Sequence, residues 1–163
     1  MDTTKTEEQF KRVMDECRTL FAKKLHDYGA SWRILRPSSL TDQLFIKAKR
    51  IRSLEITGTS LVGEGIRPEF IALINYGIIG LIQLEKGYVD TVDTKPEEAL
   101  ALYDAHAKEC LELMLRKNHD YNEAWRDMRI SSYTDFILTK IQRIKEIEGL
   151  DGKTLVSEGI DSN

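Results

Sequence analysis

The chain has 163 residues, of which 41% are hydrophobic and 31% are charged, and its formal net charge is -3. This balance is typical of a globular domain with a real core, and it excludes a strongly basic surface for nucleic acid. The longest apolar run, FIALINYGIIGLIQL, carries Asn75 and Gln83 and is short for a membrane span, which needs about 20 residues. The polar, acidic N-terminus is unlike a signal peptide, so we expect a cytoplasmic protein with Cys17 and Cys110 reduced.

The first elements in chain order are predicted to be helices. Apolar residues recur at helical spacing and predict a helix over about 6–27, with Gly29 placed to end it. After a loop, Ser39 or Thr41 is expected to cap a second helix at its N-terminus.

The third predicted helix begins near Pro68 and runs to about Lys86. It is apolar nearly all round, so we expect it to be the central, buried element. Thr94 and Pro96 are expected to open a fourth helix, and a fifth follows the pattern of the second. No strand pattern stands out, so the predicted fold is all-α with five main helices.

The most informative feature is an internal repeat with an offset of 93 residues. The repeat keeps His-Asp-Tyr, Trp-Arg, Ser-Ser-x-Thr-Asp and Lys-x-x-Arg-Ile in the same order, and LVGEGI returns as LVSEGI after one inserted residue. We therefore predict a single helical domain made of a first repeat over 8–86 and a second over 95–163 that lacks its third helix. The helix pair without its third helix leaves apolar surface, which favours a homo-oligomer.

Basic residues at helical spacing are the first candidates for a functional site. Lys47 lies within the apolar stripe of the second predicted helix with Arg50 on its edge, and Lys140 and Arg143 repeat this arrangement in the fifth. Basic groups turned toward a core need anionic partners, which can be phosphates of a ligand or carboxylates of the protein. The carboxylates considered are Asp27, Glu64, Asp120 and Glu158.

The repeated acids and aromatics leave two interpretations open. Asp27 and Asp120 each end a helix, where a negative charge is unfavourable without a specific partner. They could bind a divalent cation or a basic side chain, or cap the following turn. Trp32 and Trp125, each followed by an arginine, could stack on a nucleotide base or seal an edge of the core.

The order Lys-x-x-Asp-Tyr, Trp-Arg, Lys-x-x-Arg-Ile, Glu-Gly-Ile and Asn-Tyr-x-Ile-Ile resembles the nucleotide modification associated domain family, type 1. It has a more distant likeness to the MazG-like all-α nucleoside triphosphate pyrophosphohydrolases, which hold magnesium with helix-borne carboxylates. Phage proteins related to these enzymes, which the sequence also resembles, carry acidic residues at two positions where this sequence has Pro68 and Ala72. The likeness implies catalytic Asp27, Glu64, Asp120 and Glu158, with Asp120 and Glu158 on Mg²⁺, and phosphate-binding Lys24, Lys47, Arg50, Lys117, Lys140 and Arg143.

Two functions are therefore expected from the sequence. One is a magnesium-dependent pyrophosphohydrolase-like protein that acts on (deoxy)nucleoside triphosphates. The other is a non-catalytic helical module that binds a nucleotide or a protein partner, or an oligomeric scaffold.

Overall fold

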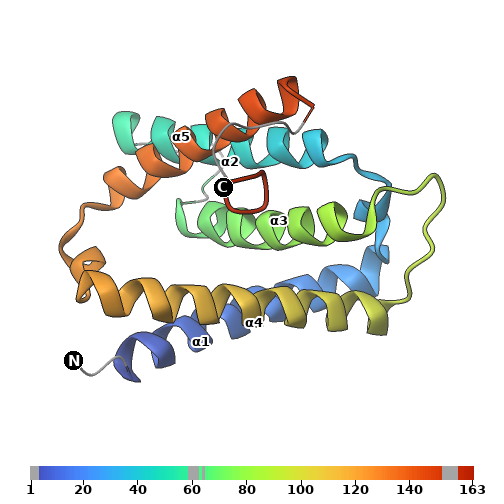
Figure 1. Cartoon of the computed structure of the whole chain (residues 1–163), viewed down its shortest axis with the longest axis horizontal. Coiled ribbons are helices and arrows are strands. Elements are labelled where there is room, and N and C mark those ends of the chain that lie inside the picture. Colours follow the sequence, from blue (N-terminus) through green and yellow to red (C-terminus); the bar gives the residue numbers. More distant parts are fainter. Residues whose placement is uncertain (1–3, 59–62, 64, 152–157) are drawn as a thin grey trace. The chain divides into compact units, whose positions relative to one another are not determined.

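The computed structural model describes residues 4–58, 63, 65–151 and 158–163 (Figure 1). This part of the chain is all-helical, which confirms the predicted fold class, and it contains no strand. None of its helices combines the length and the hydropathy that a membrane span requires. The elements are α1 (Thr4–Tyr28), η1 (Ser31–Ile34), α2 (Pro37–Thr57), α3 (Arg67–Lys86), α4 (Pro96–Tyr121), η2 (Ala124–Asp127) and α5 (Ile130–Gly149), where η marks a 3-10 helix.

Proline, rather than a capping side chain, marks the start of three helices. Pro37 begins α2, so the predicted caps Ser39 and Thr41 are wrong and these residues lie inside the helix. Pro96 begins α4, and Thr94 makes a different contact, described below. The fixed φ of proline suits the first turn, where a backbone N–H would lack a helical partner in any case.

Contacts between residues divide the chain into two compact units that cross the repeats. Unit 1 contains residues 1–34 and 89–128, and unit 2 contains residues 35–88 and 129–163. Unit 1 therefore pairs α1 with its repeat equivalent α4, and unit 2 pairs α2 with its equivalent α5 and adds α3. The division into repeats over 8–86 and 95–163 stays a prediction from the sequence.

Unit 1 is an antiparallel pair, since the start of α1 meets the end of α4 through Thr6 and Glu123 (Figure 1). Its interior contains the Phe21 ring stacked on that of Tyr103, with centroids 4.4 Å apart. Cys17 of α1 is also fully buried, and burial raises the pKa of the Cys110 thiol. A thiol with a raised pKa is a poor nucleophile.

Unit 2 is held by an apolar cluster to which all three of its helices contribute. Ala48 and Ile51 of α2 pack with Leu73 of α3 and Ile141 of α5. Polar contacts fix α2 antiparallel to α5 at both ends: the Thr41 hydroxyl donates to Glu148, and Arg52 pairs with Asp135. Helix α3, which was predicted to be the central, buried element, has seven buried residues along it.

Candidate functional site

The first of the two repeated Trp-Arg pairs holds a buried charge. Arg33 in η1 is only 1% exposed. Its Nε lies 3.2 Å from the Thr94 hydroxyl and 3.4 Å from a carboxylate oxygen of Asp93, and its carbonyl accepts a hydrogen bond from the backbone N–H of Val89. Because a buried guanidinium needs anionic and hydrogen-bonding partners, Arg33 fixes the segment that leads into α4.

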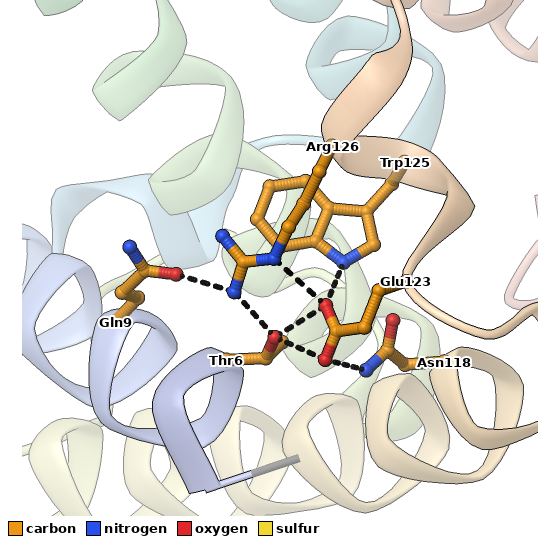
Figure 2. A network of polar contacts seen from close by, with 6 residues as sticks. All are labelled: Thr6, Gln9, Asn118, Glu123, Trp125 and Arg126. Atoms are coloured by element: carbon orange, nitrogen blue, oxygen red, sulfur yellow. Dashed lines mark hydrogen bonds and ion pairs between the residues drawn. The ribbon is translucent and has the colours of Figure 1, made fainter. Parts of the chain in front are cut away.

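The second Trp-Arg pair makes the corresponding contacts at the other end of the α1–α4 pair (Figure 2). Arg126 in η2 donates to the Thr6 hydroxyl at 2.8 Å and to the Gln9 side-chain carbonyl at 2.9 Å, both near the start of α1. The Thr6 hydroxyl in turn lies 2.6 Å from both carboxylate oxygens of Glu123, to which Arg126 also donates. The hydroxyl thus links the arginine to the carboxylate.

Glu123 is the centre of this network (Figure 2). It also accepts hydrogen bonds from the Asn118 amide at 2.8 Å and from the Trp125 indole at 3.0 Å. The Thr6 and Asn118 hydrogen bonds, together with the positive charge of Arg126, lower the pKa of Glu123 below its ordinary value. Asn122 and Glu123 both have positive φ, a conformation that side chains other than glycine rarely adopt, so the network offsets backbone strain.

The two tryptophans are accounted for by contacts within unit 1. Trp32 is partly buried against Phe21, with ring centroids 6.1 Å apart. This environment is the one expected for a tryptophan that covers the edge of a core. Trp125 lies under the Arg126 guanidinium, 4.4 Å from the ring centroid. Base stacking by Trp32 and Trp125 stays a prediction.

The basic pair of α2 has a partner that was not among the carboxylates considered from the sequence. Glu69, in the first turn of α3, is 5% exposed. Its carboxylate lies 3.0 Å from Arg50 Nη1 and 3.6 Å from Lys47 Nζ. These contacts attach α3 to α2, so both basic groups already have a carboxylate of the protein, and phosphate binding by them stays a prediction.

The equivalent pair on α5 has a different environment. Lys140 is exposed, and no acidic side chain of the described residues pairs with it. Arg143 lies 3.3 Å from Glu146, one turn further along the same helix. Glu69 lies three residues after LVGEGI, and the equivalent position three residues after LVSEGI is Asn163. The side-chain amide of Asn163 donates a hydrogen bond to the Gly159 carbonyl.

The remaining predicted site residues lie at the C-terminal ends of α1 and α4. Lys24, Asp27, Lys117 and Asp120 are all exposed. The Asp27 carboxylate lies 3.2 Å from Nδ1 of His26, and the Asp120 carboxylate lies 3.3 Å from Nδ1 of His119. The helix pair runs antiparallel, so the structure places these two groups at opposite ends of unit 1.

The predicted magnesium site stays a prediction from the sequence. Nowhere in ranges 4–58, 63, 65–151 and 158–163 do three or more His, Cys, Asp or Glu side chains gather closely enough to hold a metal ion. Glu158 is exposed, whereas Glu64 lies outside the described residues.

Comparison with known proteins identifies the family. The family model for Nucleotide modification associated domain 1 matches residues 24–84 and 117–163, which together make up more than half of the chain. The chain belongs to this family, and both repeats contribute to the match. No curated protein and no solved structure matches it.

The Glu69 contacts predict different effects for the same substitution in the two repeats. Arg50→Met should lower the free energy of unfolding by about 2 kcal/mol, less than for a fully buried pair because Lys47 stays beside Glu69. Arg143→Met, the repeat-matched control, should change it by less than about 0.5 kcal/mol because the Arg143–Glu146 pair is exposed. Urea denaturation measures both; equal effects in the two variants would contradict the assignment.

The lowered pKa of Glu123 predicts a pH-dependent stability. The ionised form is favoured in the folded chain, so its contribution is present above the unfolded pKa of about 4.3 and is lost as the pH falls through the lower folded value. Glu123→Gln should be less stable than the unsubstituted chain near neutral pH, and the difference should shrink on acidification. Urea denaturation at several pH values tests this, with Glu7→Gln, a substitution at an exposed pair with Lys11, as the control. A difference that is independent of pH would refute it.

Proposed function

We propose that the chain is a non-catalytic helical module that binds nucleotides at two separate helix-end segments, Lys24–Tyr28 and Lys117–Tyr121, one at each end of unit 1. The two segments have the sequences KLHDY and KNHDY. They end α1 and α4, the paired helices of unit 1.

The observation that carries this proposal is the pattern of exposure within the segments. Tyr28 and Tyr121 are 74% and 72% exposed, and the lysine, histidine and aspartate of each segment are exposed as well. The single buried position is the one that differs, Leu25 in the first segment and Asn118 in the second. Packing constraints act on buried side chains, so packing does not explain why the four exposed ones are identical.

The side chains of the segments have the chemistry that a nucleotide requires. An exposed tyrosine ring offers a face for a base, and stacking of this kind contributes about 1–3 kcal/mol per base. A lysine supplies positive charge for a phosphate. Histidine and aspartate supply hydrogen-bonding groups for the sugar or the base edge. The family to which the chain belongs is described as associated with nucleotide modification, which supports this class of ligand.

The hydrolytic form of the hypothesis has less support. A magnesium-dependent pyrophosphohydrolase needs a cluster of carboxylates, and among the described residues Asp27 and Asp120 lie in no such cluster. Hydrolysis by the MazG-like mechanism is therefore an outcome for the test to decide. A cytoplasmic location and self-association stay predictions from the sequence.

The proposal predicts that nucleotide binding at each segment depends on the exposed tyrosine of that segment. A panel of ribo- and deoxyribonucleotides is titrated against the full chain by calorimetry, with and without Mg²⁺. For any nucleotide that binds, the double variant Tyr28→Ala/Tyr121→Ala should lose about tenfold or more in affinity. Tyr88→Ala, at an exposed tyrosine outside both segments, should leave the affinity unchanged.

Three outcomes would count against the proposal. If no nucleotide binds, the ligand class is wrong. If one binds with equal affinity to the double variant, the helix-end segments are not the site. If a bound triphosphate is cleaved between its α and β phosphates, the chain is an enzyme and not a binding module.

A further inference from the structure

Helix α5 carries a face that is the sequence equivalent of the α2 face covered by α3. At the offset of 93 residues, Lys140 corresponds to Lys47 and Arg143 to Arg50. On a helix, Phe136 lies on the same face as these two, since residues four and seven positions apart share a side. We call Phe136, Lys140 and Arg143 the α5 seat.

The contacts of α3 on α2 show what such a face accepts. Helix α3 is apolar along most of its length, and Leu73 packs into the cluster that includes Ala48 and Ile51. In its first turn it presents Glu69, which the two basic groups of α2 bind. The face of α2 thus accepts an apolar helix with one carboxylate near its N-terminus.

The α5 seat has the same basic groups and a more apolar surface. Phe136, which replaces Gln43 of α2, is 58% exposed. Lys140 is exposed, and Arg143 is only partly covered by its pair with Glu146. Toward the C-terminus of α5, the exposed face of the seat ends at Ile147, which is buried. Aromatic side chains and arginine, of which the seat has one each, are enriched at the surfaces that bind other proteins.

We infer that the α5 seat binds a helix of a partner protein that is apolar and carries a carboxylate in its first turn. The carboxylate would pair with Lys140 and Arg143, and the apolar side would cover Phe136. Charge complementarity selects this occupant, because the repeat-equivalent face of α2 binds a helix of that description in the same chain.

A second copy of the chain is a poorer candidate for the occupant. Among the described helices only α3 combines an apolar body with an acid in its first turn, and its Glu69 is already bound to α2. Two seats that face each other would bring four basic side chains together, which is unfavourable.

The test uses a labelled peptide with the sequence of residues 66–86 and a polar tail at its C-terminus, titrated against the full chain by fluorescence anisotropy. We expect saturable binding. Lys140→Met/Arg143→Met in the protein, or Glu69→Gln in the peptide, should each weaken binding about tenfold or more, as for a hydrogen bond to a charged group. Combining the two changes should add little, because both remove the same interaction.

Matched control variants separate binding at the α5 seat from nonspecific binding of the peptide. Ile46→Ala/Lys49→Met removes an exposed apolar and an exposed basic side chain from α2 and should leave the peptide affinity unchanged. Phe136→Ala should weaken binding. Circular dichroism checks that each variant remains helical.

Five results would overturn the inference. Equal binding by the seat variant and the control variant, or no effect of the peptide glutamate, removes the seat as the site. Weaker binding to Lys47→Met but not to Lys140→Met means that the peptide competes with the resident α3. A dimer by light scattering that Phe136→Ala dissociates makes the occupant a second copy. A nucleotide affinity that falls in Lys140→Met would make the seat a phosphate site.

Discussion

The structure of unit 1 depends on two arginines that close the α1–α4 pair at opposite ends. A guanidinium cannot lose its proton under ordinary conditions, so when it is buried it must be surrounded by acceptors. Arg33 meets this requirement with Thr94 and Asp93, just before α4. Arg126 is exposed, and it makes corresponding hydrogen bonds to Thr6 and Gln9 near the start of α1 and to its own neighbour Glu123. Each Trp-Arg pair thus fixes the beginning of the other repeat's first helix, which gives a structural reason for both copies of the motif.

Duplication has left identical residues with different partners. Lys47 and Arg50 attach α3 through Glu69, whereas Lys140 is exposed and Arg143 pairs with Glu146 of its own helix. The helix-end segments show the opposite case, in which exposed residues are the same in both copies. The structure therefore divides the repeated residues into those that have partners within the fold and those that are exposed.

Helical periodicity and the placement of Gly29 were sufficient to predict the five α-helices of the described residues and most of their bounds. The start of α2 was missed because Pro37 occupies the first helical position and displaces the expected cap. The partners of the basic residues were missed for another reason. Glu69 and Glu123 correspond to Asn163 and Ala30 in the other copy, so a search for residues kept in both repeats passes over them. The available signal for Glu69 was a carboxylate inside an otherwise apolar segment, where it needs a positive partner. The pairing of α1 with α4 depends on contacts between distant parts of the chain, which periodicity does not specify.

The most direct test of this account is amide hydrogen exchange on Arg33→Met and Arg126→Met. If the arginines close opposite ends of the pair, Arg33→Met should lose protection at amides 99–103 of α4, and Arg126→Met at amides 8–12 of α1. Each variant then serves as the control for the other. Loss of protection at the same amides in both variants, or at none, would contradict the reciprocal arrangement.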